Sequence, residues 1–247
     1  MTSALLTGRW LPFPVTEGRQ RLYCLPHAGG SASAFRSWVG QLPGVSVCPL
    51  QPPGRETRQG ETPHTSMAAL ASELASFILD DASGPYAVYG HSLGALVGFE
   101  VVQEIRRRGG ALPTRLIVSG CPAPQWVSPE DPTVDVLSDE QIVSLLRSLG
   151  GTPELFLSDP RVLRMILPPI RADLTVKNTY RYAPAPPLEI PITALAAGDD
   201  ARASIESMLA WRDQTIRAFR THHFSGGHFA VLEQESRTLS HLASALR

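Results

Sequence analysis

The amino-acid sequence predicts an α/β fold in which a mainly parallel central sheet is flanked by helices. Short apolar runs bounded by turn residues alternate along the chain with longer segments of helical periodicity. This alternation is interrupted once, between about residues 122 and 187, where helical segments follow one another without a convincing strand. The chain has 247 residues, of which 43% are hydrophobic, so it has enough apolar material for a substantial core.

The predicted strands are rich in β-branched, aromatic and other apolar residues and are bounded by turn-forming residues. They cover residues 21–26, 45–50, 86–90, 115–119, 191–197 and 218–224. A helix is expected to begin near Ala32, and another runs from Leu93 to Arg108, where Gly109-Gly110 stops it. A further helix covers Ser204 to Arg212, and a terminal helix carries Leu239, Leu242 and Leu246. Helices between most of the strands favour parallel pairing.

The interruption is predicted to contain three helices. Ser138-Asp139-Glu140-Gln141 is typical of a capping box, and the helix that it opens is closed by Gly150-Gly151. A second helix is expected from Asp159-Pro160 to Pro168-Pro169, and a third from Ile170 to Tyr180. The sequence therefore predicts one core, residues 1–121 and 188–247, with a helical insertion at 122–187.

Gly90-His91-Ser92-Leu93-Gly94 matches the G-x-S-x-G pattern of a nucleophile elbow. The turn forces its serine toward a strained backbone, and a side chain at either flanking position would collide with the incoming helix. A predicted strand precedes the pentapeptide and a predicted helix follows it, which is the order that the motif needs. We therefore expect Ser92 to be a nucleophile, the alternative being a glycine-flanked turn with an incidental serine.

A serine nucleophile needs a base, usually a histidine that a carboxylate holds in place. In an elbow architecture the order along the chain is serine, acid, histidine. His228 lies in a glycine-rich loop directly after a predicted strand, where its side chain could reach the elbow. His222 and His223 are neighbours within that strand and would point to opposite faces, while His241 lies on the terminal helix. We expect His228 to be the base.

The acid is expected in Gly198-Asp199-Asp200, which follows the strand at 191–197. Two neighbouring aspartates cannot both face the histidine. Asp200 is favoured because one extra residue gives the loop room to turn inward, which leaves Asp199 as a solvated turn residue or a helix cap. The loop after the strand at 115–119 offers no carboxylate, which supports the later position.

Two backbone N–H groups are expected to form the oxyanion hole. One belongs to Leu93, the residue after the nucleophile. The other belongs to Ala28, in a glycine-rich turn that opens a helix, with Gly29 as the alternative. His27 precedes Ser92 in the sequence, and we interpret it as structural.

Several motifs together resemble those of a type II thioesterase over nearly the whole chain, from about residue 9 to the C-terminus. They are His27-Ala28-Gly29-Gly30 followed by Phe35, Gln51-Pro52-Pro53-Gly54-Arg55-Glu56-Thr57-Arg58, the Gly90–Gly94 elbow, Arg171-Ala172-Asp173 and Gly226-Gly227-His228-Phe229. The Pro-Gly-Arg-Glu-x-Arg segment is the most discriminating. The resemblance implies an α/β-hydrolase fold and hydrolysis of acyl groups from the phosphopantetheine arm of carrier proteins in polyketide and non-ribosomal peptide synthesis. The family's acid loop usually reads Asp-Pro-x-Val, whereas Ala201-Arg202-Ala203 follows Asp200 here, which leaves Asp199 open.

The insertion is well placed to cover the elbow as a lid, although its helices could also be ordinary packing elements. As a lid it would supply apolar walls for an acyl chamber from Leu145, Leu146, Leu149, Leu163 and Ile166. The resemblance implies an acyl or peptidyl carrier protein as partner, acidic near its attachment serine, so we expect arginines at the entrance. Two alternatives remain: an esterase or lipase that acts on oxygen esters, and a carrier-binding module without turnover.

Composition and charge agree with an intracellular enzyme. A net charge of −1 gives no reason to expect nucleic-acid binding. Cys24, Cys48 and Cys121 have no metal-ligand spacing and are expected to be buried free thiols in a reducing compartment, the cytoplasm. No run approaches the ~18 apolar residues of a membrane span, and no signal sequence is recognised. We expect a monomer without metal or cofactor.

Overall fold

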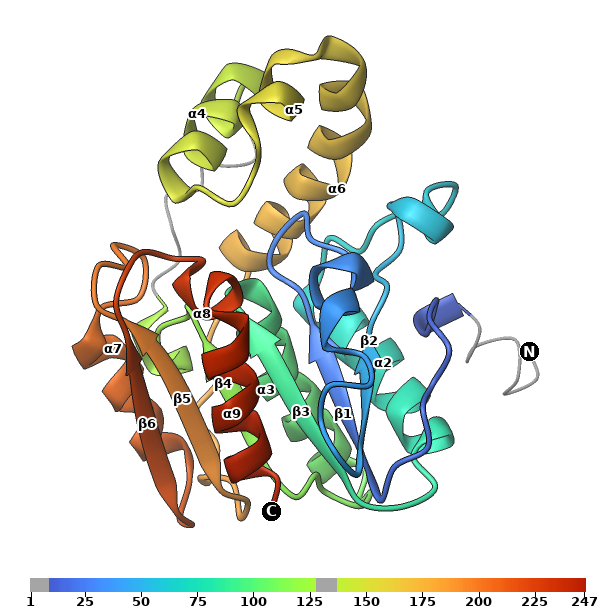
Figure 1. The fold of residues 1–247 in the computed structure, drawn as a ribbon, viewed down its shortest axis with the longest axis vertical. Helices are drawn as coiled ribbons and strands as arrows, with labels where there is room; N and C mark the ends of the chain where they lie inside the picture. Colours follow the sequence, from blue (N-terminus) through green and yellow to red (C-terminus); the bar gives the residue numbers. More distant parts are fainter. Residues whose placement is uncertain (1–8, 128–136) are drawn as a thin grey trace.

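The computed structural model describes residues 9–127 and 137–247, and the parts of the predicted segments outside these ranges are not considered further. Six strands form one sheet in the order β2-β1-β3-β4-β5-β6, and every neighbouring pair is parallel (Figure 1). The six strands begin and end within one residue of the predicted bounds. They are β1 Gln20–Leu25, β2 Val45–Pro49, β3 Tyr86–His91, β4 Leu116–Ser119, β5 Ile192–Ala197 and β6 Phe219–Phe224.

Helices cover both faces of the sheet. One face packs against α2 (Met67–Asp81), α3 (Leu93–Arg107) and α7 (Ile205–Leu209) with its 3₁₀ continuation η5 (Ala210–Gln214). The other packs against η1 (Ala32–Trp38), α8 (Ala230–Glu233) and α9 (Glu235–Ala245). Successive strand residues alternate between the two cores, so Leu22 joins one core and Tyr23 the other. Strands β3, β4 and β5 are buried along their whole length, as expected for a parallel sheet between two helical layers.

The strand order places a crevice between the loops that follow β1 and β3. Strand β1 lies between β2 and β3, so the direction in which successive strands are added reverses there. In open α/β sheets the crevice at such a reversal, outside the carboxyl ends of the strands, is where ligands bind. Leu25 at the end of β1 is in register with Gly90 near the end of β3, so the two loops lie side by side.

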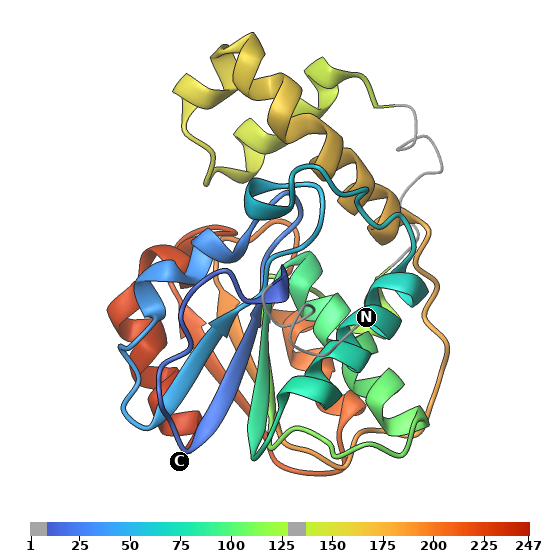
Figure 2. The ribbon, with the colours of Figure 1, turned by 90° about the vertical axis from the view of Figure 1, so that its right-hand side faces the viewer.

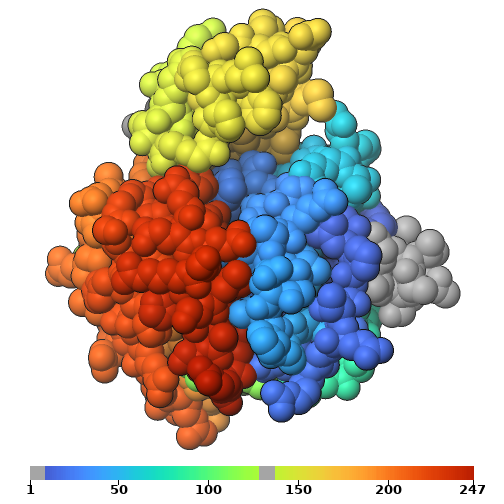
Figure 3. All heavy atoms as spheres, viewed as in Figure 1, coloured from blue at the N-terminus to red at the C-terminus, as the bar shows by residue number. Residues whose placement is uncertain are grey.

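The described residues between β4 and β5 form helices and no strand. They are η3 (Pro124–Trp126), α4 (Asp139–Leu149), α5 (Glu154–Ser158) and α6 (Pro160–Asn178). Figures 1 and 2 show α4, α5 and α6 standing over the end of the sheet, and Figure 3 shows them as a separate lobe on top of the molecule. The lobe has its own small hydrophobic cluster, centred on Ile142, Leu157 and Leu167. The predicted capping box is present, since the Ser138 hydroxyl accepts from the Gln141 N–H.

The expected break at Pro168-Pro169 is wrong, because α6 runs through both prolines without ending. A proline inside a helix removes a hydrogen bond and costs about 3 kcal/mol. Here Leu167, Ile170 and Leu174 form one continuous helical stripe across the prolines, and all three are buried in the cluster of the lobe. Burial of this stripe offsets the cost. The short helix α5 was not predicted.

The three cysteines are buried and unpaired with one another. Burial raises the pKa of the Cys48 and Cys121 thiols to about 12 and also raises that of Cys24. Within 9–127 and 137–247, no helix is both long and apolar enough to cross a membrane.

Candidate active site

Ser92 lies on a strained turn between β3 and α3. Its backbone has φ 55° and ψ −122°, a conformation that L-residues rarely adopt. A Cβ on Gly90 would lie 2.1 Å from the carbonyl oxygen of Gly94, at the start of α3, so the turn requires glycine there. A Cβ on Gly94 would instead lie 2.2 Å from the carbonyl oxygen of Leu25. The second glycine is therefore needed so that the start of α3 can lie close to the end of β1. The expectation that a side chain at this position would collide with the incoming helix is wrong.

The structure brings Ser92, His228 and Asp200 into one line of hydrogen bonds. His228 Nδ1 lies 2.9 Å from Asp200 Oδ2, and His228 Nε2 lies 3.0 Å from Ser92 Oγ. The Asp200 and His228 side chains are only 1% and 6% exposed. A carboxylate only accepts hydrogen bonds, so Nδ1 carries the imidazole proton and Nε2 is left to accept from the serine hydroxyl. This is the arrangement that activates a serine for nucleophilic attack.

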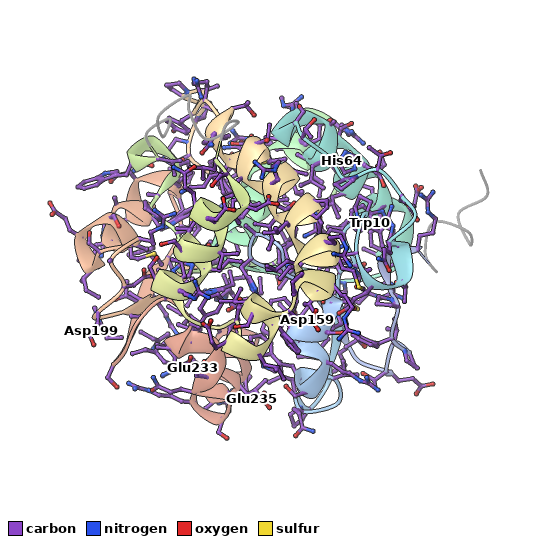
Figure 4. All side chains as sticks on the ribbon, turned by 90° about the horizontal axis from the view of Figure 1, so that it is seen from above. Trp10, His64, Asp159, Asp199, Glu233 and Glu235 are labelled. Atoms are coloured by element: carbon purple, nitrogen blue, oxygen red, sulfur yellow. The ribbon has the colours of Figure 1, made fainter. Side chains whose placement is uncertain are left out.

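Asp199 faces away from this line. Its side chain is exposed and its Oδ2 accepts from the Gly226 N–H at 3.2 Å, while in Figure 4 it lies at the rim of the molecule. The second oxygen of Asp200, Oδ1, accepts from the Arg202 N–H at 2.9 Å. The two aspartates therefore have separate roles, one against the histidine and one in holding the loop that carries it.

Two further histidines lie beside His228. The His91 ring centre is 5.1 Å from that of His228, and the His27 ring packs edge-on against Phe229 at 4.9 Å. Burial, with the charges of His228 and Arg55, lowers the pKa of His27 from 6.5 to about 4, and burial also holds that of His91 well below 6.5. Both rings are therefore neutral at pH 7. His91 was assigned no role from the sequence, although its place in the elbow motif was an available signal.

The remaining histidine candidates are not near the nucleophile. His222 on β6 stacks on His241 of α9, with ring centres 3.9 Å apart. His223, the next residue of β6, is exposed. These positions agree with the preference for His228 over these three residues as the base.

Ala28 and Leu93 line the same hollow of about 60 Å³ as Ser92 and His228. Neither backbone N–H has a hydrogen-bond acceptor among the described residues. Leu93 is the first residue of α3, so its N–H lies at the positive end of that helix. The N–H of Gly29, the alternative to Ala28, instead donates to Asp173 Oδ2 at 2.7 Å.

A second hollow, of about 160 Å³, opens beside Ser92 under the lobe. Among the predicted chamber residues, Leu146, Leu149 and Ile166 line this hollow, and Leu145 and Leu149 line the smaller one. Leu163 lines neither and packs against the cluster of the lobe. Three apolar side chains of the lobe that line these hollows were not predicted: Phe156 and Ile170 in the larger hollow and Leu174 in the smaller one. Phe156 lies on the unpredicted helix α5, and Ile170 was read as the start of a separate helix.

A parallel sheet of this order with a serine on a strained strand-to-helix turn defines an α/β-hydrolase. Residues 20–246 match the sequence model of a family described as the thioesterase domain. The chain belongs to the thioesterase family.

Individual relatives match this chain along most of their own length. The gramicidin S biosynthesis protein GrsT of Aneurinibacillus migulanus is 39% identical over 233 residues, 94% of this chain and 91% of that protein. Thioesterase PikA5 of Streptomyces venezuelae is 37% identical over 237 residues, 92% of this chain and 82% of that protein. The structure of BorB, a type II thioesterase from the borrelidin biosynthetic cluster, superposes with a TM-score of 0.87 at 38% identity, covering 96% of this chain and 98% of that one.

Proposed function

We propose that this protein is a type II thioesterase that releases acyl groups from the phosphopantetheine thioester of carrier proteins, as an editing enzyme of polyketide or non-ribosomal peptide biosynthesis. The observation that carries the proposal is the hydrogen-bonded line Ser92–His228–Asp200 in a chain of the thioesterase family. Among relatives that match along most of their length, PikA5 is named a thioesterase and BorB a type II thioesterase from the borrelidin biosynthetic cluster. The structural relative YbtT is named a type II thioesterase from the yersiniabactin NRPS/PKS pathway.

The reaction would proceed through an acyl-enzyme. His228 Nε2 takes the proton of the Ser92 hydroxyl as Oγ attacks the thioester carbonyl, while Asp200 holds the imidazole in the required tautomer and stabilises its positive charge. The N–H groups of Leu93 and Ala28 donate to the oxyanion of the tetrahedral intermediate. As the intermediate collapses, the C–S bond breaks and the pantetheine thiol leaves with the proton from His228. A water molecule, activated by the same imidazole, then releases the acid and regenerates the serine.

The lobe would serve as a lid over this centre. The hollow of about 160 Å³ lies between Ser92 and side chains of α4, α5 and α6, and it would hold the acyl group. We propose the division into a core, 1–121 and 188–247, and a lid, 122–187, on this basis. The buried free cysteines suit the reducing cytoplasm, where we place the enzyme and its carrier proteins, and we expect it to act as a monomer.

One comparison of substrates tests the proposal. The same short acyl group is presented on a carrier protein, on free pantetheine and on an oxygen ester, and kcat/KM is measured for each. We expect the carrier thioester to be the best substrate and its kcat/KM to fall steeply with added salt, because docking to an acidic carrier depends on charge. The small thioester should respond little to salt. Faster turnover of the oxygen ester would make the protein an esterase, and carrier binding without turnover of any substrate would make it a binding module.

A further inference from the structure

The Pro-Gly-Arg-Glu-x-Arg segment has no part in the reaction described above, yet the structure folds it against the loop that carries Ala28. The segment follows β2, and its Glu56 accepts hydrogen bonds from the hydroxyls of Ser31 and Ser33 at 2.6 and 3.0 Å. Arg55 beside it is 7% exposed. The segment therefore holds the glycine-rich loop from the side.

Arg55 forms a buried ion pair with Asp173 on α6, 118 positions further along the chain. Its Nη1 donates to Asp173 Oδ2 at 2.6 Å and its Nη2 donates to Oδ1 at 3.0 Å. The same Nη1 also donates to the carbonyl oxygen of Gly30 at 3.0 Å. A buried ion pair is tolerated only when further hydrogen bonds satisfy its remaining groups. Here the glycine-rich loop supplies them.

The hydrogen bonds of this loop fix the direction of the Ala28 N–H. The Gly30 N–H donates to the carbonyl oxygen of His27 at 2.8 Å, and that carbonyl shares a planar peptide unit with the Ala28 N–H. Arg55 holds the Gly30 carbonyl and Asp173 accepts from the Gly29 N–H at 2.7 Å, so the loop is anchored directly after this peptide unit.

Helix α6 also holds the loop by direct packing. Gly29 has φ +75°, and a Cβ on it would lie 2.3 Å from Cγ1 of Ile170, one helical turn before Asp173. The loop thus lies between the Pro-Gly-Arg-Glu-x-Arg segment on one side and α6 on the other. No side chain larger than hydrogen fits at this contact.

We propose that Arg55 and Asp173 are positioning residues for the oxyanion hole, which hold the Ala28 N–H where the tetrahedral intermediate needs it. This inference rests on the proposed function. The ion pair also matters electrostatically. An unpaired Asp173 carboxylate beside the oxyanion hole would repel the oxyanion, and the guanidinium of Arg55 neutralises the charge of that carboxylate. Because Asp173 belongs to the lobe, the hole is complete only while α6 lies against the loop.

The test measures kcat of Asp173→Asn with a small acyl thioester. The active sites are counted by endpoint labelling of Ser92 with a phosphonate, and kcat is expressed per active site. Asparagine keeps an acceptor for the Gly29 N–H but loses the ion pair with Arg55. We expect kcat per site to fall about 10- to 100-fold, less than the 10²- to 10³-fold cost of deleting an oxyanion donor, with KM changed less than about threefold. Affinity for a trifluoromethyl ketone, which forms a tetrahedral adduct, should fall by a similar factor.

Two further variants separate positioning from folding. Asp173→Glu keeps the charge and displaces the carboxylate, so it should give a smaller loss of kcat per site, and it serves if Asp173→Asn does not fold. Asp81→Asn is the matched control, because Asp81 is a buried carboxylate paired with Arg21 far from the elbow. It should lower the Tm and leave kcat per site unchanged.

Unchanged kcat per site in both Asp173 variants, or a loss of kcat without loss of affinity for the ketone, would overturn the inference. Activity of the wild-type enzyme on the small thioester is the separate test of the proposed function. An inactive wild type refutes that function, whereas an active wild type with unaffected variants refutes only the positioning role.

Discussion

Replacing Asp200 by asparagine should lower kcat about 10³- to 10⁴-fold, through the tautomer of His228. The Arg202 N–H donates to Asp200 Oδ1, so an asparagine would keep its carbonyl oxygen there and turn its amide NH₂ toward His228 Nδ1. Facing a donor, Nδ1 gives up its proton, and Nε2 then carries the hydrogen and cannot accept from Ser92. The loss corresponds to about 4 to 5.5 kcal/mol of transition-state stabilisation.

The assay is steady-state hydrolysis of a small acyl thioester, with active sites counted by phosphonate labelling. Asp199→Asn is the matched control, because Asp199 is exposed and an asparagine there still accepts from the Gly226 N–H. We expect the control to stay within about twofold of wild type. Equal losses in the two variants, or a larger loss in Asp199→Asn, would refute the assignment of the acid.

Three other predictions follow from the same geometry. Ser92→Ala should stay folded, lose several orders of magnitude in turnover and escape labelling by a serine-directed phosphonate, and labelling that persists would contradict the nucleophile. Leu146→Trp should fill part of the hollow and lower kcat/KM for long acyl substrates more than for acetyl or propionyl ones. Leu155→Trp, at a residue 77% exposed on α5, should leave kcat/KM unchanged for both kinds of substrate. The same chain-length preference in both variants would argue against an acyl chamber in this hollow. Between the ordinary pKa of 6.5 and the folded value of about 4, His27 binds a proton only in the unfolded chain, so the free energy of unfolding should fall as the pH drops through this range. His27→Phe should reduce the slope of the unfolding free energy against pH by up to about 1.4 kcal/mol per pH unit, as measured by urea unfolding at several pH values. Identical slopes would mean that His27 is not buried in its neutral form.

The strands and the serine turn could be predicted because each is encoded locally. A buried parallel strand is a short apolar run between turn residues, and the elbow needs glycines at fixed spacing around Ser92. His228 could be predicted as the base because the other downstream histidines lie within a predicted strand, now β6, and a predicted helix, now α9. The two neighbouring aspartates differ by only one residue of loop length in the sequence, and the contact with His228 Nδ1 distinguishes Asp200 in the structure.

What could not be predicted depends on contacts between distant segments. The ion pair of Arg55 with Asp173 joins residues 118 positions apart, and neither residue signals its partner in the sequence. Helix α6 continues through Pro168-Pro169 because tertiary burial overrides a local preference, although the stripe from Leu167 to Leu174 was visible in the sequence. Leu163 shares a helical face with Ile170 but lies two turns before it and lines neither hollow, because the direction in which α6 crosses the site is set by packing.

The burial of all three cysteines makes the natural sequence a ready background for site-directed spectroscopy. Thiol reagents attack the thiolate, and Cys24, Cys48 and Cys121 are all buried and held protonated by their raised pKa values. A single cysteine introduced at Leu155, on the outer face of the lobe, would therefore be the one reactive thiol in the described part of the chain. A fluorophore or spin label attached there would test whether the lobe moves during turnover, without replacement of any native cysteine.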